Sequence, residues 1–221
     1  MYAKYKFDLH GYPEWDKRRI KHLIDTYGEA FFKGKTVLEV GCGYAAIGKA
    51  MLDLGANVTV SDARGEHIEV VKERYPEIQA LVMDSESATW DYPEDKYDII
   101  IHYGLLYHLP NPDDNISLML KHCEYLFLET EVLDVEDSQH IVYTEEDKTS
   151  FGMSFSGNAC TPSWAYVERL LDQSNFAWQR VFPEDCPEGQ GWHKYNWEQL
   201  GNRPLHVSGQ RAMWYCKRKE E

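Results

Sequence analysis

The chain has 221 residues, of which 43% are hydrophobic and 14% aromatic, and its formal net charge is −14. This composition supports a substantial core and excludes a disordered chain. The negative charge argues against sequence-independent binding of nucleic acid, because such binding uses Lys and Arg to neutralise phosphates. At this length we expect residues 1–221 to form a single α/β domain with an elaboration.

Several sequence signals are missing. The sequence has no run of 18 apolar residues and no basic, apolar leader, so we expect a soluble, cytoplasmic protein with no membrane association. No group of His, Asp and Cys has metal-ligand spacing, so no required metal is predicted. The cysteines are scattered without a CxxC pair, which favours free thiols over disulfides or a zinc site. They are Cys42, Cys123, Cys160, Cys186 and Cys216.

The first 132 residues alternate between predicted helices and strands. An amphipathic helix is predicted over residues 14–33, because its apolar residues recur at helical spacing. Strands are then predicted at 36–40, 57–63, 80–84, 97–102 and 125–132, with helices at 45–54, 65–74 and 112–122. Such alternation implies crossover connections and a mostly parallel sheet with helices on both faces.

The pattern changes after residue 132. Residues 133–160 are polar and lack clear periodicity, and Thr161 and Pro162 resemble an N-cap and first-turn proline that open a helix through Phe176. Strands are predicted at 177–182 and 211–218, and they should be antiparallel because no helix joins them. The prediction is a Rossmann-like, seven-stranded, mostly parallel sheet with an antiparallel last strand. The irregular segments 133–160 and 184–209 are the predicted substrate-facing insertions, since functional residues concentrate on loops.

The segment TVLEVGCGYAAIGKAM, residues 36–51, is a strand that turns on Gly41 and Gly43 into a helix. Such a turn lets a ligand approach the backbone closely and places the positive helix N-terminus beside it. The turn alone does not identify the ligand, because dinucleotide-binding folds share it.

The residues that end the first four predicted strands are Glu39, Asp62, Asp84 and His102. Ligands of open parallel sheets bind at the carboxyl ends of the strands, so these side chains should meet at one site. Asp62 suits a ribose diol, and Asp84 with Ser85 suits an adenine amino group. Three acids would repel a pyrophosphate but suit a positively charged nucleoside, which favours S-adenosylmethionine over NAD.

Five segments in this order resemble the class I S-adenosylmethionine-dependent methyltransferase family. They are LEVGCG (38–43), VTVSDA (58–63), ALVMD (80–84), DIIIHYGLLYHLP (98–110) and LFLETEV (126–132). The resemblance covers residues 14–132 strongly and 161–218 more weakly. It implies an enzyme of that family with S-adenosyl-L-methionine as its cofactor.

The resemblance also implies which residues hold the cofactor. Glu39, Gly41, Cys42 and Gly43 would hold its methionine part. One departure is Ala45, which stands where many members have a third glycine. Asp62 would hold the ribose with Ala63 beside the adenine, Asp84 and Ser85 would contact the adenine, and the segment from His102 and Tyr103 to His108 would lie near the sulfonium.

Two segments are similar to particular branches of the family. GLLYHLP and GMSFSGNACTPS are similar to methyltransferases of sugar and cell-surface glycan biosynthesis, and related segments occur in enzymes that modify tRNA wobble uridine. The leading hypothesis is O-methylation of a small-molecule or sugar-containing acceptor. The alternatives are an RNA-modifying methyltransferase of the same fold and a catalytically silent protein that binds the cofactor.

Three residues are candidates for catalysis, since a hydroxyl acceptor must lose its proton. His108 is the first candidate base, although it could instead cap a helix or pack beside the cofactor. Glu129 lies with Glu131 on one face of an apolar strand, where a buried carboxylate is costly unless it is paired or functional; the alternative is a solvated strand end. His193 is the third candidate.

Aromatic residues mark two further segments. Trp192, Tyr195 and Trp197 surround His193 and could stack on a sugar, or instead form a small aromatic core. Residues 1–33 are predicted to form a helical lid over the cofactor, with Tyr2, Tyr5, Tyr12 and Trp15 either in that lid or stapling the first helix.

Overall fold

A seven-stranded sheet organises the chain in the computed structural model, which describes residues 7–9, 11–87, 89–186, 193–195, 202–203 and 210–220. The strand order is β3-β2-β1-β4-β5-β11-β9. The strands are β1 (Thr36–Val40), β2 (Asn57–Asp62), β3 (Gln79–Val82), β4 (Tyr97–Tyr103), β5 (Cys123–Glu131), β9 (Phe176–Val181) and β11 (Arg211–Arg218). Only β11 runs against its neighbours, and it pairs antiparallel with both β5 and β9. The predicted fold class is confirmed.

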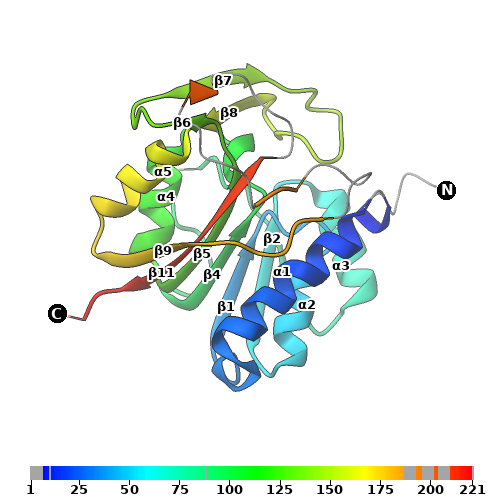
Figure 1. Cartoon of the computed structure of the whole chain (residues 1–221). Coiled ribbons are helices and arrows are strands. Elements are labelled where there is room, and N and C mark those ends of the chain that lie inside the picture. The colour runs from blue at the N-terminus through cyan, green and yellow to red at the C-terminus, as the bar shows by residue number, and fades with distance from the viewer. Residues whose placement is uncertain are drawn as a thin grey trace.

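Helices cover both faces of the sheet (Figure 1). One layer contains α1 (Tyr12–Tyr27), α2 (Ala46–Asp53) and α3 (Gly65–Arg74), and the other contains α4 (Pro112–Lys121) and α5 (Trp164–Asp172). Neighbouring residues of β1 show why both layers form: Val37 packs in the core beneath α1 and α2, whereas Leu38 and Val40 pack in the core beneath α4 and α5. Apolar side chains on both faces of a strand require a cover on each side.

Some predicted boundaries were wrong. The first helix begins at Tyr12 and ends at Tyr27, because Gly28 at φ 76° stops it, and a short 3₁₀ turn, η2 (Glu29–Phe31), follows. The third strand ends at Val82, so Asp84 lies in the loop beyond it.

The segment expected to be irregular after residue 132 contains strands. It holds β6 (Asp134–Val135), β7 (Ile141–Glu145) and β8 (Asn158–Pro162), and β7 pairs antiparallel with β8 as a hairpin. Figure 1 shows this hairpin above one end of the sheet. Thr161 and Pro162 therefore belong to β8, and the N-cap of α5 is Ser163, whose hydroxyl accepts the backbone N–H of Tyr166 at 2.9 Å. Ser163 could cap the helix because its extended backbone aims the hydroxyl at that amide.

Part of the second predicted insertion, 184–209, lies outside the described residues. Its described residues include the short strand β10 (Asn202–Arg203), which pairs with β6, and Lys194, which forms a bridge with Gln210. Arg211 also donates its backbone N–H to the carbonyl of Lys194 at 2.9 Å. These contacts place residues 193–195 beside the start of β11.

Candidate active site

A cavity of about 240 Å³ lies at the carboxyl ends of β1, β2 and β4. Its walls come from residues within 7–19, 39–47, 62–67, 103–109 and 151–155, together with Arg74, Tyr75, Asp84, Ser85 and Glu86. The position agrees with the rule that ligands of open α/β sheets bind beyond the carboxyl ends of the strands.

The glycine turn lines the cavity with its backbone. Gly41 and Gly43 have φ values of +64° and +53°, which favour glycine. A Cβ added at Gly41 would lie 3.0 Å from Leu105, and one added at Gly43 would lie 3.0 Å from Phe7. Both the backbone conformation and the limited space around it therefore favour glycine at these two positions.

Asp62 at the end of β2 holds this turn. Its carboxylate accepts the backbone N–H of Gly43 at 3.0 Å and that of Arg64 at 2.9 Å, and His67 Nδ1 lies 3.1 Å from it. A carboxylate has lone pairs for further donors, and Asp62 also lines the cavity next to Ala63.

Glu39 is a second carboxylate of the cavity wall. It is buried and accepts the backbone N–H of Gly48 in α2 at 2.8 Å. Burial raises the pKa of Glu39 to about 8, although the bond from Gly48 opposes the shift. Asp16 of α1 lines the same cavity, and burial raises its pKa to about 6 against the opposing effect of Arg19. The structure therefore places two carboxyls with raised pKa values beside the glycine turn.

Asp84 and Ser85 line the cavity from the loop after β3, with the Asp84 carboxylate accepting the backbone N–H of Glu86 at 2.9 Å. Asn115 of α4 links this loop to the core, because it donates to the Ser85 carbonyl at 2.9 Å and lies 2.8 Å from His102 Nε2. His102 is fully buried and is not among the lining residues, and burial lowers its pKa to about 4. His102 was expected to contact the cofactor, but the structure places it in the core behind the cavity because it is buried against Asn115. Tyr103 lines the cavity.

His108 lies on the cavity wall in the 3₁₀ turn η3 (Leu106–His108) that follows β4. Its Nδ1 is 2.7 Å from the carboxylate of Glu146, which lies just beyond the end of β7. Sequence reasoning missed Glu146 because 38 residues separate the pair and the acids of that segment resemble a solvated face. The β7–β8 hairpin packs on η3 and so brings Glu146 next to His108.

Glu129 is fully buried on β5 and forms ion pairs with two arginines. Arg19 of α1 donates to one oxygen, and Arg211 of β11 donates to the other at 3.1 Å. Arg211 also donates to the Tyr107 hydroxyl at 3.0 Å and lies 3.7 Å from Glu131. Glu129 does not line the cavity, so these ion pairs account for its burial. A catalytic role for Glu129 stays a prediction.

His193 is buried against Trp15, with ring centroids 3.2 Å apart and planes at 23°. Trp15 donates its indole N–H to the Tyr195 hydroxyl at 2.7 Å and lines the cavity, whereas His193 does not line it. Burial and the charges of Arg211 and Arg19 lower the pKa of His193 far below its ordinary value. His193 and Tyr195 thus form an aromatic layer behind Trp15. Trp192, Trp197, Tyr2 and Tyr5 lie outside the described residues.

The cavity fits the chemistry of S-adenosylmethionine. Its carboxyl groups suit a sulfonium and a ribose diol, the glycine turn admits close approach to the backbone, and Arg19 is a cation on the wall. Arg64 and Arg74 also line the cavity. All three arginines have protein partners: Arg19 pairs with Glu129, Arg64 binds loop carbonyls and Arg74 binds Asp8. Among the described residues, no group of three His, Cys, Asp or Glu could hold a metal ion, and no helix is long and apolar enough to cross a membrane.

A family model described as "Methyltransferase domain" matches residues 12–180. Among curated proteins, the ubiquinone biosynthesis O-methyltransferase of Shewanella pealeana is 33% identical over 119 residues, which cover 51% of this chain and 49% of that protein. A protein N-lysine methyltransferase of Danio rerio is 30% identical over 102 residues, covering 42% of this chain and 46% of that protein. The chain spans about half the length of the curated relatives it matches.

Solved structures show the same fold at low identity. The N-terminal domain of EvdMO1, solved in the presence of SAH and D-fucose, superposes with a TM-score of 0.68 at 14% identity, covering 93% of this chain and 83% of that one. Magnesium protoporphyrin IX methyltransferase from Synechocystis PCC 6803, solved with bound SAM, gives a TM-score of 0.59 at 14% identity, covering 92% of this chain and 80% of that one.

Proposed function

The chain belongs to the methyltransferase domain family, and on that premise we propose that it transfers the methyl group of S-adenosylmethionine to a hydroxyl oxygen of a small molecule. One observation carries the proposal: His108 lies on the wall of the same cavity as the glycine turn, Asp62 and Asp84. A candidate base and a candidate cofactor site therefore share one enclosed space.

The proposed cofactor contacts use residues that line the cavity. We assign Asp62 to the ribose diol, Asp84 and Ser85 to the adenine, and the backbone of Gly41 and Gly43 to the methionyl part. We assign Arg19 to the methionyl carboxylate, because it lines the cavity next to Gly104 while it also pairs with Glu129. When bound, the cofactor supplies an electrophilic methyl group on a positively charged sulfur.

His108 would act on the acceptor. A hydroxyl oxygen becomes a stronger nucleophile as it loses its proton, and His108 would take that proton while the oxygen bonds to the methyl carbon. The carbon–sulfur bond breaks with its electron pair on sulfur, which leaves a methyl ether and S-adenosylhomocysteine. Alignment of the acceptor by the cavity walls would supply the rest of the rate enhancement.

Aromatic side chains suggest what the acceptor looks like. They come from the N-terminal segment, from the glycine turn, from η3 and from the loop between β7 and β8. They include Phe7, Tyr12, Trp15, Tyr44, Tyr107, Phe151 and Phe155. Aromatic walls favour an acceptor with a flat or apolar face, such as a phenol or a sugar ring. The names of a ubiquinone O-methyltransferase relative and of a neighbour solved with D-fucose support these two classes. On this proposal residues 7–15 and 151–155 form the acceptor side of the cavity.

The test is methyl transfer from labelled S-adenosylmethionine to catechols, to sugars and to matched compounds with an amine in place of the hydroxyl. We expect transfer to hydroxyl compounds, and His108→Asn should lower kcat by about 10²-fold or more while the Kd for the cofactor stays within about twofold. His140→Asn is the control, because His140 does not line the cavity. Tight cofactor binding without transfer to any acceptor would instead support a silent binding protein, and transfer to RNA would support the RNA-modifying alternative.

A further inference from the structure

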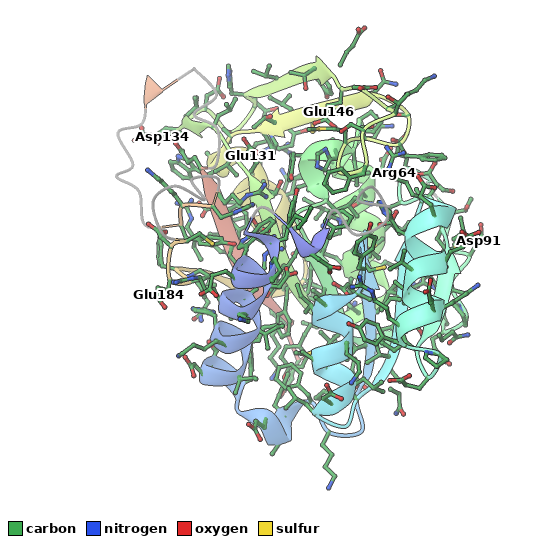
Figure 2. The ribbon with its side chains drawn as sticks, turned by 90° about the vertical axis from the view of Figure 1, so that its right-hand side faces the viewer. Arg64, Asp91, Glu131, Asp134, Glu146 and Glu184 are labelled. Carbon is green, nitrogen blue, oxygen red and sulfur yellow. The ribbon has the colours of Figure 1, made fainter. Side chains whose placement is uncertain are left out.

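The loop between β7 and β8 is tied to the cavity wall at two points. Arg64, which follows Asp62 and Ala63, donates to three carbonyls of this loop: Lys148 at 3.0 Å, Met153 at 3.1 Å and Ser154 at 3.3 Å. The second point is Glu146, at the start of the loop. Figure 2 shows Arg64 and Glu146 at the same end of the molecule.

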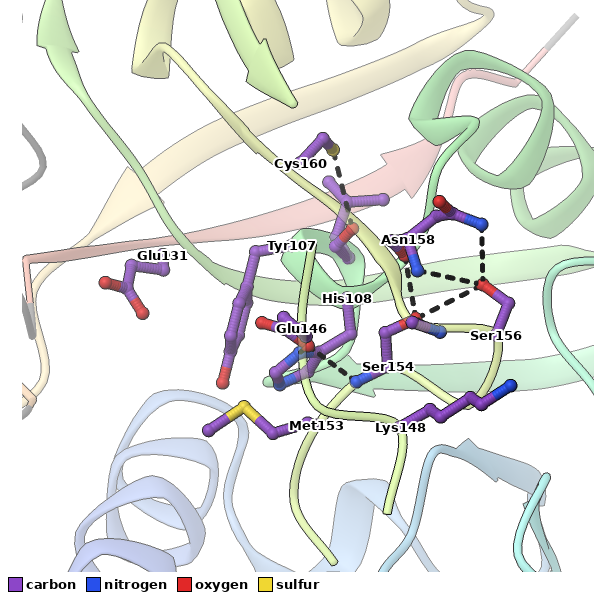
Figure 3. A network of polar contacts seen from close by, with 12 residues as sticks. Tyr107, His108, Glu131, Glu146, Lys148, Met153, Ser154, Ser156, Asn158 and Cys160 are labelled. Atoms are coloured by element: carbon purple, nitrogen blue, oxygen red, sulfur yellow. Dashed lines mark hydrogen bonds and ion pairs between the residues drawn. The ribbon is translucent and has the colours of Figure 1, made fainter. Parts of the chain in front are cut away.

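Glu146 binds the loop and the candidate base with one oxygen. Its Oε2 accepts the backbone N–H of Ser154 at 2.5 Å and lies 2.7 Å from Nδ1 of His108 (Figure 3). Burial would raise the pKa of the Glu146 carboxyl, but the bond from His108 and the bond from Ser154 outweigh burial and hold the pKa below its ordinary value. Glu146 is therefore an ionised acceptor, and it has no proton to donate to the imidazole.

This arrangement fixes the tautomer of His108. An ionised carboxylate only accepts hydrogen bonds, so the nitrogen facing it, Nδ1, must carry a proton. Neutral imidazole then has its lone pair on Nε2, the nitrogen that a base uses. In the described part of the chain, no group forms a hydrogen bond with Nε2 of His108.

The loop itself reaches into the cavity. Phe151, Gly152, Met153, Ser154 and Phe155 all line it. The Ser154 hydroxyl donates to the Asn158 carbonyl at 2.7 Å and accepts the Gly157 N–H at 3.1 Å, so the turn at Ser154 is internally braced. The turn at Ser154 thus connects the cavity lining of the loop to Glu146, the residue that contacts His108.

We propose that Glu146 is a positioning residue that sets the tautomer of His108 and makes a competent base depend on the loop being seated over the cavity. This inference rests on the proposed O-methylation, because it concerns the base of that reaction. If the loop moved away from the cavity, Glu146 would no longer contact His108. His108 would then not be held in the tautomer that removes the proton of the acceptor while the cavity is open. The position of the loop over the cavity and the state of the candidate base are thereby linked through Oε2 of Glu146.

Two variants and a control separate the charge of Glu146 from its two hydrogen bonds. In Glu146→Gln, the amide oxygen can still accept the Ser154 N–H and the His108 Nδ1 proton, so the loop keeps its contact while the charge beside His108 is lost. In Glu146→Ala, both contacts are lost. Glu145→Gln is the matched control, because Glu145 is the preceding residue and its side chain is exposed.

The first measurement does not use activity. Nitrogen-15 NMR of the imidazoles, with S-adenosylhomocysteine bound, should show His108 with its proton on Nδ1 in the wild-type chain and in Glu145→Gln. Glu146→Ala should give a mixture of tautomers. A wild-type His108 with its proton on Nε2 would overturn the inference.

The second measurement combines amide hydrogen exchange with kinetics. In Glu146→Gln we expect kcat to fall at least about tenfold, with exchange of residues 147–157 and the cofactor Kd close to wild type. In Glu146→Ala we expect faster exchange in this loop and a further loss of kcat. If wild type transfers methyl groups and Glu146→Ala, which lacks the acceptor, matches its kcat, the inference fails and the proposed function stands. If wild type methylates no hydroxyl acceptor, the proposed function fails, and this inference fails with it.

Discussion

Asp62 accepts the backbone N–H of Gly43 at 3.0 Å, so the end of the second strand holds the glycine turn that follows the first strand. One carboxylate thus shapes the turn and also faces the cavity. Removing it should disturb both the backbone of the glycine turn and the proposed contact of Asp62 with the cofactor.

Asp62→Ala should therefore bind S-adenosylmethionine at least about 100-fold more weakly, since hydrogen bonds to a charged group each contribute about 1.5–3 kcal/mol. Isothermal titration calorimetry measures the change. Asp91→Ala is the control, because Asp91 is exposed and does not line the cavity. Wild-type affinity in Asp62→Ala would refute the assignment of this residue.

Gly43→Ala should lower the free energy of unfolding by more than the cost of a left-handed alanine, which is about 1–2 kcal/mol. The extra cost arises because the new Cβ would meet the Phe7 ring at 3.0 Å. Gly34→Ala is a matched control, since Gly34 has φ +75° but nothing within 4 Å of an added Cβ. Urea denaturation compares the two, and equal losses would show that the Phe7 contact relaxes freely.

Glu39→Gln should remove a pH dependence of stability. The folded-state pKa of about 8 lies above the ordinary value of 4.5, so the folded chain holds a proton that the unfolded chain releases. The stability linked to Glu39 is full below pH 4.5 and is lost as pH rises to about 8. Glutamine cannot ionise and can still accept the Gly48 N–H.

Thermal denaturation of the ligand-free protein between pH 5 and pH 8.5 checks this prediction. We expect the Tm of wild type to fall relative to that of Glu39→Gln as pH rises across this range. Asp16, with its pKa raised to about 6, adds a change of the same sign at the lower end. Glu69→Gln, an exposed position on α3, should run parallel to wild type. Parallel curves for Glu39→Gln and wild type would contradict the raised pKa.

Glu129→Gln should destabilise the fold by about 3–5 kcal/mol, because it leaves Arg19 and Arg211 buried without the charge between them. Glu124→Gln, on the same strand, should cost less than about 1 kcal/mol, since that carboxylate is partly exposed and lies 3.9 Å from Arg218. Urea denaturation measures both. A stable Glu129→Gln that loses only activity would favour the catalytic role predicted from the sequence.

The sheet could be predicted from the sequence because its signals are local. Apolar strands, glycine turns and alternating helices each occupy a few consecutive residues, and the β9–β11 pair was expected to be antiparallel. Predictions from local signals were wrong where a contact between residues distant in the sequence determines the structure. Thr161 resembled an N-cap but pairs with Val142 across the hairpin, and Ser163 caps the helix instead.

The cavity was predictable in part for the same reason. Residues of the turn and of the strand ends follow regular elements, so Gly41, Asp62 and Asp84 could be placed on one edge. Side-chain direction could not be derived for His102, which extends into the core toward Asn115. Glu146 was missed because its role depends on a partner far away in the sequence. The conformation of Ala45 was also not predicted from the sequence. It adopts φ 57° at the start of α2, and this left-handed conformation explains why many family members have glycine there.

The position of β11 has a consequence for the order in which the fold can form. This strand lies between β5 and β9 and carries Arg211, yet it is the last strand to be translated. Until residues 211–218 emerge, β9 has no neighbour in the sheet, β5 has an open edge, and Glu129 lacks one of its two arginines. The nascent chain therefore exposes an edge of β5, and later β9 without a neighbour, until residues 211–218 emerge and pair with both strands.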